Sequence, residues 1–299
     1  MDDIQIRNKA FAWLSEKVSI HGDVLPREML LKGFYFDKYR VPLVSPQGIF
    51  KPQIMELPLT MTSTVKGPYK DSITYDGYLA YKYRGNDPLH RDNQGLREIM
   101  QRNIPLIYLH GLIPGKYLAV WPVYIIGDDP ERLTFKVAVD DISSILEKND
   151  KNLISDASND LIRKYKTAEI KVRIHQRTFR ERVIAAYQEQ CALCRLHHIE
   201  LLEAAHIISD SDPEGEPIVN NGISLCKLHH AAFDKYFIGI NPDYIVEVRH
   251  DILKEHDGPV LLHALQGMNN KQLILPNHKK DWPSPELLEI KYNKFRKAS

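Results

Sequence analysis

Two pairs of metal-binding residues stand out in residues 190–240, which hold all three cysteines and five of the thirteen histidines. Each pair has two residues between its members. The four residues are Cys191, Cys194, Cys226 and His229. Zinc prefers four tetrahedral ligands of the cysteine and histidine type. The spacing therefore predicts a structural zinc site, with the first pair on a knuckle and the second at the start of a helix. His197 and His198 are competing ligands, because they closely follow Cys194.

A second set of polar residues lies between and just after these pairs. His206 sits in an apolar run that reads as a strand over 201–208, and Asn221 precedes the second pair. His230 follows that pair directly, and Asp234 comes four residues later, so both face one side of a helix. An imidazole with a pKa near neutrality suits a general base. These three polar neighbours favour a functional role for His206 over that of an ordinary core histidine on an apolar strand.

The order His206, Asn221, His230 resembles the signature of the HNH (ββα-metal) endonuclease family, in its zinc-containing branch. The resemblance extends over residues 180–240. It implies that His206 is the general base that activates water and that Asn221 holds the loop that orients it. It also implies that His230 binds a catalytic Mg²⁺ or Mn²⁺ ion, with Asp234 as a second metal ligand.

The sequence departs from the family pattern at one position. Many members carry aspartate or histidine just before the base, as a metal ligand, whereas this chain has Ala205. Either Asp234 or Glu203 takes over that duty. Glu203 lies two residues before Ala205, on the same face of the predicted strand. Magnesium and manganese accept oxygen ligands and water, so both alternatives suit the chemistry.

The chain as a whole has the composition of a soluble globular protein. At 299 residues it is long enough for two domains, with 43% hydrophobic and 26% charged residues. No apolar run reaches the roughly 20 residues of a membrane span. Three clustered cysteines favour thiolate ligands in a reducing compartment, so we expect a cytoplasmic protein. The net charge of +1 does not exclude a nucleic-acid partner, because a basic face can be balanced elsewhere.

The periodicity predicts an α+β protein. Helical periods occur at 4–18, 94–103 (with Asn93 as N-cap) and from 285 onward, and a charged helical region runs over 141–187. Strands are expected at 72–83, 105–110, 117–126, 133–139 and 244–248. The first group of strands indicates a small β-barrel or curved sheet. The predicted domains are 1–145 for recognition, 146–178 as a helical connector, and 179–299 for the nuclease with its C-terminal extension.

The first domain carries a second, shorter resemblance. The stretch Tyr75-Asp76-Gly77-Tyr78 is similar to the Tyr-Asp-Gly element of SRA domains, which are PUA-like β-barrels that flip modified cytosine into a pocket. The resemblance implies that Tyr75 or a neighbouring aromatic stacks on the base and that Asp76 reads its edge. Arg84 and His90 are candidates for the rim or a phosphate contact. The alternative is that these tyrosines are ordinary core or surface residues of a strand.

A basic stretch precedes the cysteine pairs. It contains Lys171, Arg173, Arg177, Arg180 and Arg182. Next to a nuclease motif this pattern favours contact with DNA phosphates, and the alternative is a solvated helix face.

Taken together, the two resemblances predict a restriction endonuclease that recognises modified cytosine in double-stranded DNA. One such site breaks one strand, so the two-fold symmetry of DNA predicts a homodimer. The alternatives are a sequence-specific restriction or homing nuclease that ignores modification, a zinc-bearing DNA-binding regulator without nuclease activity, and an RNA nuclease.

Overall fold

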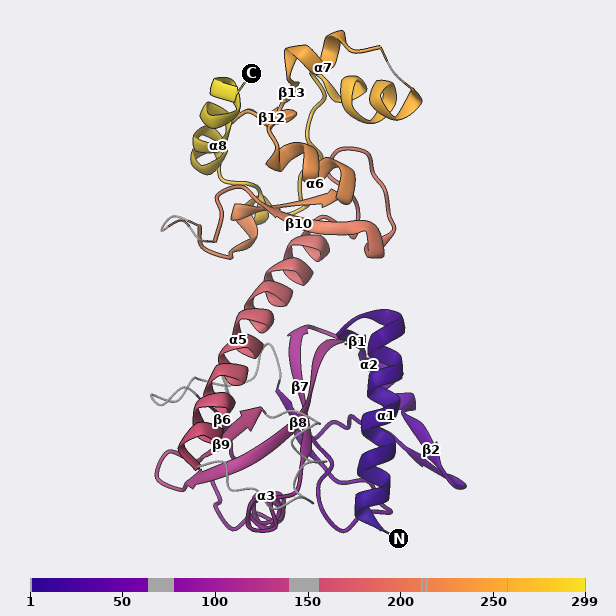
Figure 1. The fold of residues 1–299 in the computed structure, drawn as a ribbon, viewed down its shortest axis with the longest axis vertical. Helices are drawn as coiled ribbons and strands as arrows, with labels where there is room; N and C mark the ends of the chain where they lie inside the picture. Colours follow the sequence, from indigo (N-terminus) through magenta and orange to yellow (C-terminus); the bar gives the residue numbers. More distant parts are fainter. Residues whose placement is uncertain are drawn as a thin grey trace. The chain divides into compact units, whose positions relative to one another are not determined.

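The computed structural model describes residues 2–63, 78–139, 156–210, 212, 215–256 and 258–298, with the backbone alone for 156–162. The chain divides into two compact units, Met1–Arg177 and Thr178–Ser299 (Figure 1). The predicted boundary at residue 145 lies outside the described residues. The three-part division into 1–145, 146–178 and 179–299 therefore stays a prediction.

The first unit is built on a curled sheet. In spatial order its described strands are β4 (Ile49–Phe50), β5 (Thr60–Ser63), β7 (Leu106–Ile113), β8 (Lys116–Asp129), β9 (Thr134–Val139) and β6 (Leu79–Lys82), and β1 (Val24–Pro26) pairs with the start of β8. Neighbouring strands are antiparallel except for the parallel pair β5 and β7. Register shifts interrupt the β7–β8 and β8–β9 ladders. Such bulges bend a strand and increase its twist, so the sheet curls into a half-barrel.

Both faces of this sheet are covered, because side chains alternate along each strand. On β7, Ile107 and Leu109 join a core formed with α1 (Asp3–His21), α2 (Arg27–Lys32) and the hairpin β2 (Phe34–Phe36) to β3 (Tyr39–Val41). Leu106 and Tyr108 face the other core, which includes α3 (Arg91–Gln101) and Ile174 of a long later helix. Figure 1 shows α1 lying against one side of the sheet.

Two local predictions for this unit differ from the structure. The helix predicted at 94–103 starts at Arg91, and its N-cap is His90, whose ring accepts a hydrogen bond from the amide of Asp92. Asn93 is wrong as the N-cap. Its side chain is buried and bonds the backbone of Arg84 and Asp87, which fixes the turn before the helix.

The two long strands are also longer than predicted. β7 continues to Ile113 and β8 begins at Lys116. Most of residues 111–116, which we expected to form a connection, therefore lie in the two strands of a hairpin. Gly115 supplies the positive φ of +83° that this tight turn requires. Of the strand predicted at 72–83, the part over 72–77 lies outside the described residues.

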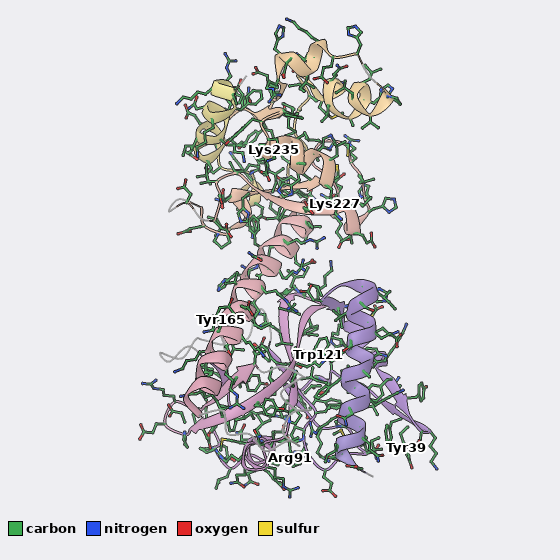
Figure 2. The ribbon with its side chains drawn as sticks, viewed as in Figure 1. Tyr39, Arg91, Trp121, Tyr165, Lys227 and Lys235 are labelled. Carbon is green, nitrogen blue, oxygen red and sulfur yellow. The ribbon has the colours of Figure 1, made fainter. Side chains whose placement is uncertain are left out.

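The second unit begins within α5 (Asp156–Ala186), the helical connector. The short turns η2 (Ile199–Leu201) and η3 (Val219–Asn221) each lead into a strand, β10 (Leu202–His206) and β11 (Gly222–Cys226). These strands form an antiparallel hairpin, and α6 (Lys227–Asp234) follows directly, with Cys226 as its N-cap. The predicted start of a helix at the second metal-binding pair is confirmed. Lys227 and Lys235 mark the two ends of α6 in Figure 2.

The remaining elements complete one core with this hairpin and helix. They are β12 (Ile238–Ile240), β13 (Val246–Val248), α7 (His250–Lys254), the short π-helix η4 (Leu261–Leu265), the 3₁₀-helices η5 (Gln266–Met268) and η6 (Lys279–Asp281), and α8 (Pro285–Ala298). Helix α8 packs closely on β12. A Cβ atom on Gly239 would lie 2.5 Å from the Phe295 ring, so this position leaves no room for a side chain.

None of the helices in the described part of the chain is both long enough and apolar enough to cross a bilayer.

Candidate functional site

Three sulfurs and one ring nitrogen meet where the first cysteine pair faces the start of α6. The ligand atoms of Cys191, Cys194, Cys226 and His229 all lie within 4.8 Å of one another. The Cys194 and Cys226 sulfurs are 4.0 Å apart, and the Nδ1 atom of His229 is 3.2 Å from the Cys226 sulfur. A tetrahedron with zinc–sulfur bonds of about 2.3 Å has edges of about 3.8 Å. This Cys₃His cluster therefore fits a structural zinc ion.

The ring of His229 is oriented for that role. Its Nε2 lies 2.6 Å from the carbonyl oxygen of Ala264, so Nε2–H donates there and Nδ1 faces the sulfurs. A metal-binding histidine commonly has such a partner on its other nitrogen. His229 is buried, whereas the competing ligands His197 and His198 are exposed and lie outside the cluster. Hydrogen bonds from Cys194 and Cys226 lower the pKa of the Cys191 thiol, which favours the thiolate that zinc binds.

His206 ends β10 opposite Gly222 on β11. Its ring stacks on Phe179 of α5, with ring centroids 4.0 Å apart and planes at 14°. A Cβ atom on Gly222 would lie 2.7 Å from the Phe179 ring. Glycine at this position therefore lets α5 approach the hairpin and support the histidine from one side.

The chemistry of His206 is set by burial and nearby charges. Its Nε2 atom is buried and makes no hydrogen bond with any described residue. Burial is the largest cause that lowers its pKa, and the charges of His230 and Lys291 lower it further, while Asp210 and Asp234 oppose them. The ring is therefore neutral at neutral pH, the state that a general base needs.

Asn221 holds the chain that follows His206. Its side-chain oxygen accepts a hydrogen bond from the amide of Ile208 (2.9 Å), and its nitrogen donates to the carbonyl oxygens of Ile208 (3.0 Å) and Glu216 (2.9 Å). The Asn221 carbonyl also accepts from the amide of Ile207. Because Asn221 is buried, its two side-chain bonds with Ile208 are shielded from water. They fix the backbone directly after His206.

His230 lies between two carboxylates. Its Nδ1 atom is 2.6 Å from Glu203 on β10, and its Nε2 atom is 3.2 Å from Asp234, one turn later on α6. The hydrogen bond to Asp234 is the largest cause that raises the pKa of His230; Glu203 adds to it and burial opposes it. Glu203 and Asp234, the two candidates for the ligand that is missing at Ala205, therefore contact different nitrogens of the His230 ring.

Lys291 on α8 also reaches this centre, and the spacing of the motif does not predict it. Its Nζ atom is 3.5 Å from Asp234, and it lies over the rings of Phe233 (4.4 Å to the centroid) and Tyr236 (5.6 Å). The side chain is only 14% exposed. Lys291 follows Asp234 by 57 residues, so only the packing of α8 brings the two together.

The candidate DNA-binding residues of α5 lie among acidic and backbone partners. Arg173 and Arg177 both pair with Asp23, at 2.9 and 3.0 Å, and remain about 40% exposed. Arg180 donates to the carbonyl oxygens of residues 199 and 202 and pairs with Glu181. Lys171 is also engaged by another residue of the chain.

The candidates nearer the N-terminus are placed only in part. Arg84 pairs with Asp92 at the start of α3. Tyr75 and Asp76 lie outside the described residues, so their proposed contact with a flipped base stays a prediction.

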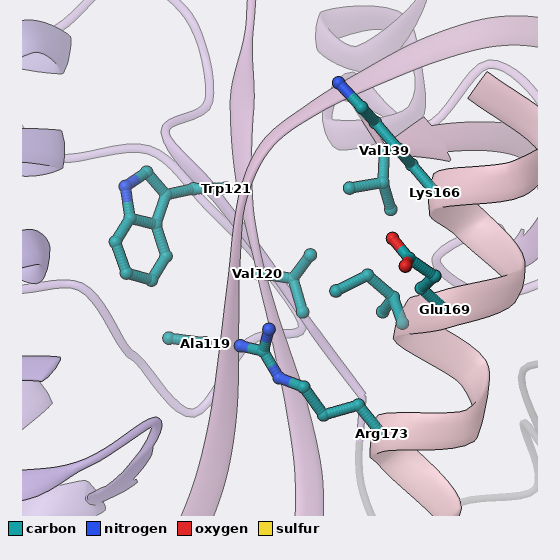
Figure 3. A pocket seen from close by; sticks show the side chains of 8 residues that line it. Ala119, Val120, Trp121, Val139, Lys166, Glu169 and Arg173 are labelled. Carbon is teal, nitrogen blue, oxygen red and sulfur yellow. The ribbon is translucent and has the colours of Figure 1, made fainter. Parts of the chain in front are cut away.

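A pocket of about 480 Å³ lies in the first unit, where β8 and β9 face α5 (Figure 3). Its lining is Ala119, Val120, Trp121, Val139, Lys166, Glu169, Ile170 and Arg173. In Figure 3, Glu169 and Arg173 reach from α5 toward Val120, while the Trp121 ring lies on the other side of the strand. The pocket thus has an apolar floor and charged walls.

A buried polar cluster lies on the same face of the sheet. The Nδ1 atom of His110 is 2.8 Å from the Tyr108 hydroxyl and 3.0 Å from the Ser63 hydroxyl. Burial, with a smaller effect of His175, lowers the pKa of His110 to about 4. The imidazole is therefore neutral and can both donate and accept hydrogen bonds. No motif in the sequence indicates this cluster, because it joins two parallel strands that are distant in the chain.

Comparison with known proteins agrees with the geometry of the second unit. Residues 191–241 match a protein family described as HNH endonuclease. The solved structures that match the chain include the following two. One is titled "Modification dependent TagI restriction endonuclease", with 14% identity over 80% of this chain and 81% of that chain and a TM-score of 0.30. The other is a "Type IV phosphorothioation-dependent restriction endonuclease ScoMcrA", with 17% identity, 59% and 48% coverage, and a TM-score of 0.21.

No curated protein matches the chain. The family match spans the Cys₃His cluster, the β10–β11 hairpin and α6. The second unit of this chain therefore carries an HNH endonuclease domain, a domain of phosphodiester hydrolases.

Proposed function

We propose that the chain is a metal-dependent DNA endonuclease whose catalytic centre is formed by His206, His230 and Asp234. One observation carries the proposal. His230 is held between two carboxylates beside a neutral His206 whose Nε2 no described residue engages. A base that is free to accept a proton next to a histidine–aspartate pair is the combination that metal-assisted hydrolysis requires.

The residues present fit a catalytic divalent cation. The Nε2 atom of His230 and a carboxylate oxygen of Asp234 lie 3.2 Å apart, so both can serve one ion. Glu203 bonds the other nitrogen of His230 and orients the ring, which makes Asp234 the replacement for the ligand missing at Ala205. Mg²⁺ commonly takes few protein ligands and completes its shell with water and phosphate oxygens. When bound, the ion supplies the positive charge that a departing 3′-oxygen needs.

His206 and Asn221, the other candidates in the signature, activate water and hold the backbone, respectively. His206 takes a proton from the attacking water, and its stack on Phe179 holds the ring in place. Asn221 holds the loop that follows His206 in place through its three side-chain hydrogen bonds. These roles are the ones that the resemblance to HNH endonucleases implies.

The lowered pKa of His206 gives a prediction about pH. A general base works only when neutral, so the rate falls as pH drops through its pKa. Since burial lowers that pKa, we expect the acid limb of the cleavage profile to lie below the value of about 6.5 of an ordinary histidine. Single-turnover rates from pH 5 to 8.5 at saturating metal test this. An acid limb at pH 7 or higher would contradict the assignment.

We further propose that the first unit selects the DNA and that the selected feature is modified cytosine. Three observations support this. The Tyr-Asp-Gly stretch lies just before β6 in the sequence, the sheet curls into a half-barrel, and its α5 face carries the pocket of about 480 Å³. A pocket of this volume with an apolar floor and a few polar groups is typical of small-ligand recognition. Arg84, Arg173, Arg177 and Lys171 are the proposed phosphate contacts of this unit.

A comparison of two plasmids tests both parts of the proposal. We expect cleavage of a plasmid that carries modified cytosine in Mg²⁺ or Mn²⁺, and an intact unmodified plasmid of the same sequence. Reactions without added divalent cation are the control. Equal cutting of both plasmids would favour a nuclease that ignores modification. No cutting under any ion would favour a zinc-bearing DNA-binding regulator.

Cutting both strands requires two catalytic centres, and we propose that a homodimer supplies them. Dimerisation on DNA would make the rate of double-strand cleavage rise more steeply than linearly with protein concentration. Nicked intermediates that accumulate at low protein concentration would support this arrangement.

A further inference from the structure

We infer that Lys291 is a further catalytic residue, which binds a non-bridging oxygen of the scissile phosphate. The inference rests on the proposed function, since it assumes that His206 and Asp234 flank the reacting phosphodiester. It adds a residue that lies 50 positions beyond the family match, on the C-terminal helix α8.

The position of Lys291 supports this role. Its ammonium group is 3.5 Å from Asp234, and its charge also acts on His206. It therefore lies near both the base and the proposed metal ligand. The scissile phosphate must lie between those two groups, because water attacks from the side of the base while the metal assists the departing oxygen.

The surroundings of Lys291 hold it in place. The ammonium group lies over the rings of Phe233 and Tyr236, and the side chain is mostly buried. A cation held in this way needs little reorganisation to meet charge that develops on a phosphate oxygen. The separation of 3.5 Å from Asp234 is longer than a short ion pair, so a phosphate oxygen can compete for the same ammonium group.

The alternative role for Lys291 is to orient Asp234. These roles differ in their effect on metal dependence. Loss of an orienting residue weakens metal binding, so a higher metal concentration restores the rate. Loss of a phosphate contact lowers the rate at every metal concentration and also removes one ionic contact with DNA.

The test uses Lys291→Met in the full-length chain, because methionine keeps contact with the Phe233 ring without the charge. We expect about a 10²-fold lower single-turnover rate at saturating Mn²⁺, similar to the loss of one preorganised donor. The half-saturating Mn²⁺ concentration should change by less than about threefold. Lys291→Arg keeps the charge and should recover most of the rate. Lys297→Met, an exposed change of equal charge on the same helix, should match the wild type.

A second measurement does not depend on activity. Binding of duplex DNA is followed by fluorescence anisotropy without added Mg²⁺ or Mn²⁺ over a range of salt concentrations. Lys291→Met should reduce the slope of log K against log salt by about one, as expected for one lost phosphate contact. Zinc content and thermal denaturation confirm that the variant is folded.

The outcomes separate the two proposals. A rate for Lys291→Met within threefold of the wild type, an unchanged salt slope, or a loss that added Mn²⁺ restores would overturn the role of Lys291. None of these results bears on the nuclease itself. A wild type that cuts no DNA, or a His206→Ala variant that still cuts, would instead overturn the proposed function.

Discussion

Replacing His206 with alanine is expected to lower the single-turnover rate of DNA cleavage by about 10²- to 10⁴-fold, the usual contribution of a general base. The ring is neutral, and its Nε2 is not engaged by any described residue, so it can accept the proton of the attacking water. The measurement is the rate at saturating metal on a plasmid that the wild type cuts.

The controls for this variant address folding and DNA binding. His206 is not part of the Cys₃His cluster, so the variant should retain one zinc ion per chain. It should also bind DNA as the wild type does, since the change removes no cation at neutral pH. His197→Ala removes an exposed imidazole from the same unit and should leave the rate unchanged. Cleavage by His206→Ala within threefold of the wild type would reject the base assignment.

Replacing Cys191 with serine is expected to prevent the second unit from folding. The four ligands tie the knuckle at residues 191–194 to the start of α6, and Cys191 is fully buried. Binding of structural zinc contributes on the order of 10–16 kcal/mol, which equals or exceeds the stability of a typical domain. Atomic absorption measures the zinc content of the variant, and limited proteolysis shows which unit is folded. Protease-resistant fragments should retain the first unit and lose the second.

Two comparisons sharpen this experiment. A strong chelator applied during thermal denaturation of the wild type should reproduce the behaviour of Cys191→Ser. His198→Ala, an exposed histidine near the knuckle, should keep both zinc and folding. If Cys191→Ser keeps zinc and unfolds at the temperature of the wild type, the cluster does not have the structural role assigned to it.

The zinc cluster could be predicted from the sequence because its spacing is local. Two residues between ligands suit a turn that brings both side chains to one metal, and Cys226 indeed caps α6. The choice between His197, His198 and His229 needed the structure, since all three follow a cysteine within a few residues. His229 is buried and its Nε2 bonds the carbonyl oxygen of Ala264, whereas His197 and His198 are exposed.

Other features depended on contacts between distant segments. The charge pattern of α5 identifies basic residues, but it cannot show that Arg173 and Arg177 share Asp23, which lies about 150 residues earlier. Likewise, only the packing of β10 against α6 shows that Glu203 and Asp234 contact different nitrogens of His230. Lys291 could not be found at all from motif spacing, because its position depends on how α8 packs on β12 and α6.

The close fit of Gly239 against Phe295 has a consequence for modularity. The family match ends at residue 241, yet a fragment cut there would expose the surface on which the last helix packs. It would also lose Lys291. We therefore expect that the smallest fragment that folds extends from Thr178 through α8. A fusion to another DNA-binding protein should keep this whole segment.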